Sequence, residues 1–97
     1  MQIVPTKPVP NQAITVQLSE QNVQINLYQQ PRGLFMDLFV ANAPIVIGVI
    51  CENLNAIVRN EYLGFIGELA FVDNQGSADP EYIGLGGRFS LAYIPPV

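Results

Sequence analysis

Histidine and tryptophan are missing from this chain, and cysteine occurs only once, as Cys51. Histidine is the usual general acid or base near neutral pH and a frequent zinc ligand. A lone cysteine cannot close an internal disulfide, which fits synthesis in a reducing cytoplasm. Because Cys51 ends an apolar run, we expect a small buried hydrophobe rather than a nucleophile. The sequence therefore predicts no enzyme, no cofactor and no metal centre.

Charge is also scarce. Charged residues make up 12% of the 97 residues, against about 25% in typical soluble domains, while 49% are hydrophobic and the net charge is −4. The four basic residues (Lys7, Arg32, Arg59, Arg88) are scattered along the chain, so we expect no nucleic-acid binding. No apolar run approaches the roughly 18 residues of a membrane span. A surface so poor in charge requires either neutral amides or coverage by partner proteins.

The first twelve residues contain three prolines, Pro5, Pro8 and Pro10. Proline fixes its own φ and donates no hydrogen bond, so residues 1–12 are predicted to form an extended proline-containing arm. Within the arm, Ile3 and Val4 could form a short edge strand. The arm either lies on its own domain or straps a neighbour, and residues 13–97 form a single β domain.

Apolar and polar residues alternate over most of the chain. The runs 13–18 and 22–29 are separated by a short polar turn and predict an antiparallel hairpin. Further strands are indicated at 34–41, 45–51, 68–73 and 88–94, with one or two more between 56 and 67. Six to eight short strands with regular turns predict an all-β fold, either a small antiparallel β-barrel or a β-sandwich.

The strand at 34–41 carries an unusual pattern. If Asp37 faces water, the same face also carries Phe35 and Phe39, which indicates a surface covered by a partner. The alternative is a β-bulge that shifts the register of this strand. We name both phenylalanines as candidate interface residues.

The run 45–51 is apolar throughout and rich in β-branched residues, which is typical of a strand buried on both faces. Either the second layer of a sandwich or another subunit would bury the second face of this strand. Val46 and Val49 of this run are candidate interface residues, and so are Tyr62 and Phe65 in the next segment.

The loop between Asp73 and Arg88 is rich in acidic residues and glycines. The order of ligands does not match a calcium-binding EF-hand, and the glycines lead into a strand rather than into a phosphate-binding helix. We expect a structural connection in which the glycines and Asp79-Pro80 form turns. The alternatives are a non-standard calcium site, and with it a metal-dependent enzyme, built on Asp73, Asp79 and Glu81.

Several stretches together are similar to a known family: MQIVPTKPVPNQ, LYQQPRGLFMDLFV and EYLGFIGELAFVDNQGSADPEYIGLGGRFSLAYI. The chain resembles the small baseplate plug proteins of contractile-tailed bacteriophages over nearly its whole length. The resemblance implies an all-β virion component of the tail baseplate that helps to assemble and close the distal end of the tail tube. Its partners would be hub, tube or spike proteins, and further copies of the same chain. No catalytic or metal residues are carried over.

A second reading is a small β-barrel module that binds a glycan or a peptide. Its signature would be exposed tyrosines beside carboxylates, for which Glu61-Tyr62 and Glu81-Tyr82 are the candidates.

Overall fold

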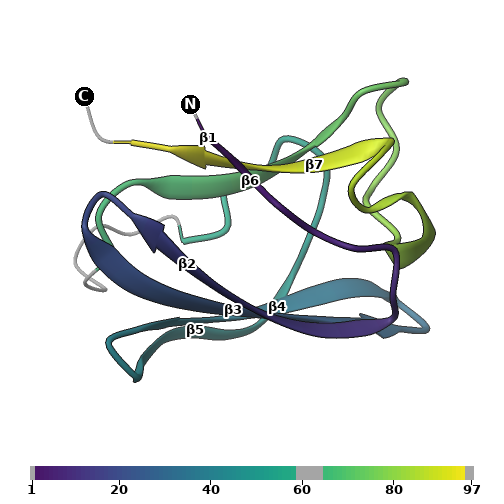
Figure 1. The fold of residues 1–97 in the computed structure, drawn as a ribbon. Coiled ribbons are helices and arrows are strands. Elements are labelled where there is room, and N and C mark those ends of the chain that lie inside the picture. Colours follow the sequence, from purple (N-terminus) through teal and green to yellow (C-terminus); the bar gives the residue numbers. More distant parts are fainter. Residues whose placement is uncertain (1, 59–64, 96–97) are drawn as a thin grey trace.

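The computed structural model describes residues 2–58 and 65–95, which form seven β-strands and one turn of 3-10 helix (Figure 1). The strands are β1 (Gln2–Val4), β2 (Asn11–Leu18), β3 (Gln21–Gln30), β4 (Gly33–Val40), β5 (Ala43–Ile50), β6 (Glu68–Asp73) and β7 (Phe89–Ile94). The helical turn, Tyr82–Gly84, lies in the loop between β6 and β7. The predicted all-β class is confirmed.

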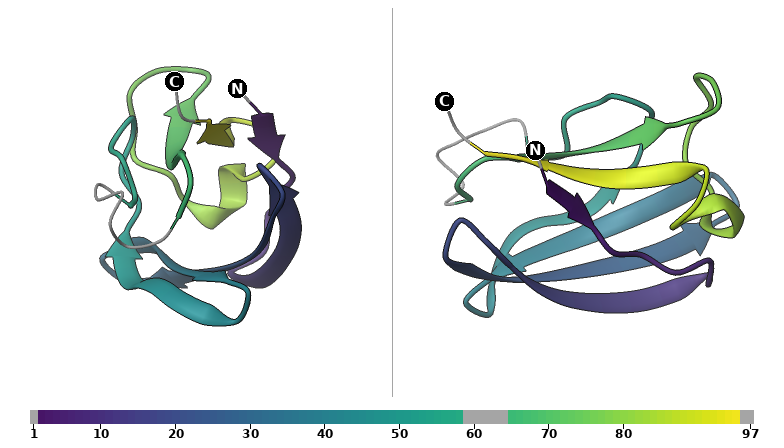
Figure 2. Two further views of the ribbon diagram at one scale, coloured as in Figure 1. Left: turned by 90° about the vertical axis from the view of Figure 1, so that its left-hand side faces the viewer. Right: turned by 45° about the horizontal axis from the view of Figure 1, so that its top comes forward.

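Two antiparallel sheets face each other across the core (Figure 2). The four-stranded sheet has the order β2-β3-β4-β5, and the three-stranded sheet has the order β1-β7-β6. The segment after β5 crosses between them, where Leu54 N donates to Phe71 O at 2.8 Å and Ile57 N to Leu69 O at 2.9 Å. Of the two architectures that the sequence left open, the sandwich describes the arrangement.

The hairpin predicted at 13–29 is β2 and β3. These strands pair in one unbroken register, from Asn11 opposite Tyr28 to Leu18 opposite Gln21. On the inner face of β3, Val23, Ile25 and Leu27 are buried, as the period-two pattern requires.

The core is formed by the inner faces of both sheets together with residues from the connecting segments. It contains Val4, Leu18, Val23, Ile25, Leu27, Leu34, Met36, Leu38, Cys51, Ile57, Val58, Phe65, Leu69, Phe71, Leu85, Phe89, Leu91 and Tyr93. Cys51 is 2% exposed, which confirms the prediction of a small buried hydrophobe.

Residues 2–4 of the proline arm lie on the domain itself. They form β1, which pairs with β7 from Gln2 opposite Tyr93 to Val4 opposite Leu91, and Val4 is buried in the core. The predicted edge strand at Ile3 and Val4 is therefore confirmed. Of the two roles predicted for the arm, the structure places residues 2–4 on their own sheet rather than on a neighbour.

Two strand predictions need correction. The run 45–51 is not buried on both faces within the chain, because β5 is an edge strand and Ile47 is 59% exposed. Residues 56–58 are not a strand: the chain bends there while Ile57 and Val58 reach the core. The remainder of the strand predicted from 56 to 67 lies mostly outside the described residues, and Phe65–Gly67 is not a strand either.

Candidate interaction surfaces

The outer face of the four-stranded sheet is nearly free of charge. Pairing across β2, β3, β4 and β5 places on this face the side chains that alternate with the core residues. Over β2 and β3 they are mostly neutral and polar (Asn11, Ala13, Thr15, Gln17, Asn22, Gln24, Asn26), and over β4 and β5 they are mostly apolar (Phe35, Phe39, Pro44, Ile47, Ile50), with Tyr28 between them. Asp37 is the one ionisable carboxylate on the strands of this face.

Phe35 and Phe39 lie on the outer face as predicted. Both are half-buried, while Leu34, Met36 and Leu38 on the other side of β4 are fully buried. The Phe35 ring stacks on Tyr28 with 6.0 Å between ring centroids and 17° between planes. The Arg32 guanidinium lies 6.0 Å from the Phe35 ring centroid. These side chains form one aromatic patch, in which Arg32 marks the end nearest the β3–β4 turn.

The register irregularity considered for β4 belongs instead to β5. Met36 pairs with Val49, Leu38 with Val46 and Phe39 with Pro44, so β5 uses one residue more than β4 in each of the two intervals, and the first interval contains the bulge at Gly48. Gly48 has φ +68° at the bulge, a conformation that glycine adopts without a Cβ clash. The alternation of β4 itself is unbroken.

Asp37 fixes this bulge through one of its two oxygens. Its Oδ1 accepts a hydrogen bond from Gly48 N at 2.8 Å and another from the Tyr28 hydroxyl at 2.9 Å. Desolvation and the hydrogen bond to Asp37 raise the pKa of Tyr28 above its ordinary value, so this phenol remains a donor at neutral pH. Tyr28, Phe35 and the Asp37 carboxylate are thus held in one fixed arrangement.

The other candidate interface residues fall in different places. Val46 and Val49 are half-buried and pack against the core from the inner side of β5. Phe65 is 2% exposed and meets Tyr93 edge-on, with ring centroids 5.8 Å apart, so it packs the core rather than a partner. Tyr62 lies outside the described residues.

The sequence pattern missed the outer residues of β5. Pro44 pairs with Phe39 and Ile50 pairs with Phe35, so both extend the aromatic patch across the edge strand, and Ile47 is exposed beside them. The sequence signal for the bulge in β5 was Gly48 within an otherwise β-branched run, because an isolated glycine in a strand often marks a bulge.

The outer face of the three-stranded sheet exposes fewer apolar residues. Ile3, Ala92 and Ala70 stand opposite one another across β1, β7 and β6, but Ala92 and Ala70 are buried, and Glu68 stands opposite Ile94 on the same face. Ile3 is 52% exposed and Ile94, at the end of β7, is 44% exposed. The two outer faces point away from each other on opposite sides of the sandwich.

Hydrogen bonds within the chain fix the conformation of the loop between Asp73 and Arg88. The Asp73 carboxylate accepts from Gln75 N, Ala78 N and the guanidinium of Arg88, at 2.8–2.9 Å. Asp79 instead accepts from Asn53 N at 3.0 Å. Within residues 2–58 and 65–95, no three Asp, Glu, Cys or His side chains are grouped so that they could hold a metal ion.

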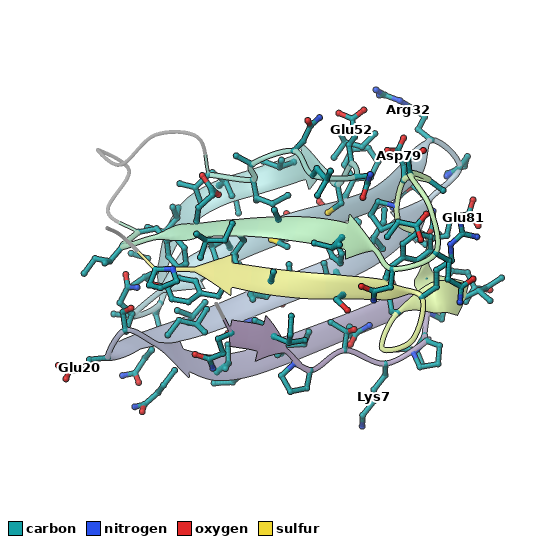
Figure 3. All side chains as sticks on the ribbon, turned by 90° about the horizontal axis from the view of Figure 1, so that it is seen from above. Lys7, Glu20, Arg32, Glu52, Asp79 and Glu81 are labelled. Carbon is teal, nitrogen blue, oxygen red and sulfur yellow. The ribbon has the colours of Figure 1, made fainter. Side chains whose placement is uncertain are left out.

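The charged side chains that are labelled in Figure 3 belong to loops and turns. Figure 3 shows Glu52, Asp79 and Glu81 toward the same end of the sandwich as Arg32, and Glu20 at the opposite end. Tyr82, which would mark a glycan site, is half-buried against the core. Among the described residues, most charged side chains therefore lie in the loops, while each outer sheet face carries one carboxylate, Asp37 on β4 and Glu68 on β6.

A small all-β sandwich with an aromatic patch on the outer face of its four-stranded sheet is suited to contacts with other proteins. The model of a family described as the cyanophage baseplate plug gp18 of Pam3 matches residues 1–96. The chain belongs to this family, so it is a structural protein of the phage virion, located in the tail baseplate among other baseplate proteins. No curated protein matches it. The described residues contain no helix that is long and apolar enough to cross a membrane.

Proposed function

We propose that the protein helps to assemble and close the distal end of the tail tube by binding hub, tube or spike proteins, without a catalytic step. The observation that carries this proposal is the outer face of the four-stranded sheet. Within its aromatic patch, Tyr28 and Phe35 are held by ring stacking and by the hydrogen bonds of Asp37. Rigid aromatic anchors lose little conformational entropy on binding and are frequent hot spots of protein interfaces.

The size of the chain supports contact with more than one neighbour. Its accessible surface is 5575 Å², and a standard interface takes about 800 Å² from each partner. Two such interfaces would cover more than a quarter of the surface. Because the aromatic patch lies on one side of the sandwich and the exposed Ile3 and Ile94 belong to the other sheet, we expect one subunit to join two neighbours.

Charge placed on the aromatic patch tests the proposal. We expect Phe39→Asp and Phe35→Asp to leave the far-UV circular dichroism spectrum unchanged and to abolish the formation of complete tails. Phe35→Asp also loses the stacking on Tyr28, worth about 1 kcal/mol, so Phe39→Asp is the cleaner variant. Ser77→Asp, in the exposed loop, adds the same charge and should assemble normally. Normal tail assembly by folded Phe39→Asp protein would contradict the proposal.

We also propose that several copies of the chain associate in the assembly. Light scattering during size exclusion, over a range of protein concentrations, measures whether the isolated chain already does so. A discrete oligomer would indicate self-complementary faces. A monomer at all concentrations would contradict self-association of the free chain and favour assembly on a preformed hub.

A further inference from the structure

One of the two carboxylate oxygens of Asp37 takes no part in the bulge. Both hydrogen bonds of Asp37 end on Oδ1, and Oδ2 accepts none from the described part of the chain. The carboxylate is half-buried, and Phe35 and Phe39 flank it along β4. A structural role at the bulge needs only one oxygen, so the second is available to a group from outside.

Within residues 2–58 and 65–95, no basic side chain forms an ion pair with Asp37. The one ion pair among the described residues joins Arg88 to Asp73, in the loop between β6 and β7. Arg32, on the same face, is turned onto the Phe35 ring. The rest of the face consists of amides, hydroxyls and apolar groups, which cannot neutralise a carboxylate.

Covering this face with a partner would remove water from the free oxygen of Asp37. A carboxylate that loses its water without gaining a cation is strongly unfavourable, and the loss of affinity would be large. A lysine or arginine from the partner removes this penalty and adds a charge-assisted hydrogen bond. The partner surface must therefore carry a basic side chain opposite Asp37, surrounded by apolar groups that meet the aromatic patch.

We propose that Asp37 is the specificity-determining residue of this docking surface, and that its Oδ2 pairs with a lysine or arginine of another baseplate protein. This inference rests on the proposed function and deepens it. The phenylalanines and Ile47 provide apolar contact that many partners could use. The single carboxylate admits a partner with a basic residue in register and disfavours one that places an acidic or apolar group there.

Asp37→Asn separates docking from folding. The amide oxygen of asparagine can still accept from Gly48 N and from the Tyr28 hydroxyl, so the bulge is retained while the negative charge is lost. Its melting temperature should match that of the wild type. Glu20→Gln, at the exposed turn between β2 and β3, removes the same charge at a site away from Asp37 and serves as the matched control.

The assay is complementation in an extract of cells infected by a phage with a nonsense mutation in the gene for this protein. Purified protein is added, and infectious particles are counted against its concentration. We expect Asp37→Asn to require at least about tenfold more protein than the wild type for half-maximal yield, and Glu20→Gln to match the wild type. The wild-type requirement should rise with salt more steeply than that of Asp37→Asn.

The outcomes separate the two proposals. Failure of wild-type protein to restore particles would refute the proposed function itself. Restoration by the wild type and by folded Asp37→Asn at equal concentrations would refute the role of Asp37 alone. For a phage carrying Asp37→Lys, we expect suppressors that change a lysine or arginine of another baseplate protein to an acidic residue. Suppressors at Arg32 of this chain would instead assign the face to a second copy and overturn the inference.

Discussion

Asp73, at the end of β6, and Arg88, just before β7, form an ion pair that closes the long loop between these strands. Arg88 Nε and Nη2 donate to the two oxygens of the carboxylate at 2.9 and 2.8 Å. The Asp73 side chain has no exposed surface, whereas that of Arg88 is 40% exposed. The carboxylate thus serves as the centre around which the backbone of residues 74–78 turns.

This pair predicts a dependence of stability on pH. The hydrogen bonds from Arg88, and then those from the backbone of Gln75 and Ala78, hold the pKa of Asp73 well below its usual range. The folded state therefore takes up a proton on Asp73 less readily than the unfolded chain, whose carboxyl pKa is about 3.9. The stabilisation is complete above that value and decreases as the pH falls toward the folded pKa.

Melting temperatures measured by circular dichroism from pH 7 to pH 2 check this dependence. We expect Asp73→Asn to melt below the wild type at pH 7, with a difference that shrinks below about pH 4. Glu20→Gln should follow the wild type throughout. A constant difference between Asp73→Asn and the wild type at all pH values would contradict the assignment.

The turn between β4 and β5 predicts a stabilising substitution. Ala41 and Asn42 have φ of +49° and +67°, the left-handed pair of a type I′ turn, without a glycine. Replacing them by Asn-Gly should raise the free energy of unfolding by about 1 kcal/mol, because asparagine and glycine adopt these angles at lower cost. Urea titration measures the change. An unchanged midpoint would mean that the turn is not strained.

Local patterns predicted the four-stranded sheet well, because its strands pair with their neighbours in sequence. Alternation alone placed Ile25 in the core and Phe35 outside it. Alternation could not predict three features of the structure. Two register shifts in β5, one of them at Gly48, turn Val46 inward between them, and a period-two pattern cannot anticipate such a local reversal. The pairing of Gln2 with Tyr93 joins the two ends of the chain.

The third unpredicted feature is Asp37. The sequence indicated that its face was covered, but it could not distinguish the two oxygens of the carboxylate. That distinction depends on the Gly48 amide, eleven residues away, and on the Tyr28 hydroxyl on another strand. A site built from a bulge and a cross-strand contact becomes visible only once the strands are in register.

Cys51 offers a direct probe of the core. Burial raises the pKa of its thiol to about 12, so the thiolate is almost absent at pH 8, whereas an unfolded cysteine has a pKa near 8.5. We expect a disulfide reagent to react with the native protein roughly a thousandfold more slowly than with the protein in denaturant. Fast, complete reaction of the native protein would show that the end of β5 opens readily.

Two glycines with positive φ should respond differently to alanine. A Cβ at Gly67 would lie 2.6 Å from the Tyr93 hydroxyl oxygen and 2.7 Å from Ile94 O, at φ +99°. Gly67→Ala should therefore cost about 2–4 kcal/mol from overpacking and backbone strain. At Gly48 the nearest atom is 3.8 Å away, so Gly48→Ala should cost only about 1 kcal/mol. Equal losses in urea titrations would contradict this difference.

Gln21 connects the four-stranded sheet to the segment that precedes β6. Its side-chain amide donates to Leu18 O at 3.0 Å and to Ile66 O at 3.1 Å, and its Oε1 accepts from Ile66 N at 2.9 Å. The Tyr93 hydroxyl also bonds to Ile66 O and, at 2.8 Å, to Ser19 Oγ. One amide side chain thus pairs with the backbone of Ile66 as a neighbouring strand would.

Gln21→Met keeps the length and packing of this side chain and removes its hydrogen bonds. We expect a loss of about 1–3 kcal/mol in the free energy of unfolding, because Ile66 N and Leu18 O lose partners at the edge of the core. Gln17→Met, which removes one exposed hydrogen bond to Asn22, should change stability by less than about 0.5 kcal/mol. If both variants lose the same amount, packing rather than hydrogen bonding holds this end of the sandwich together, because methionine preserves the packing and discards only the polar contacts.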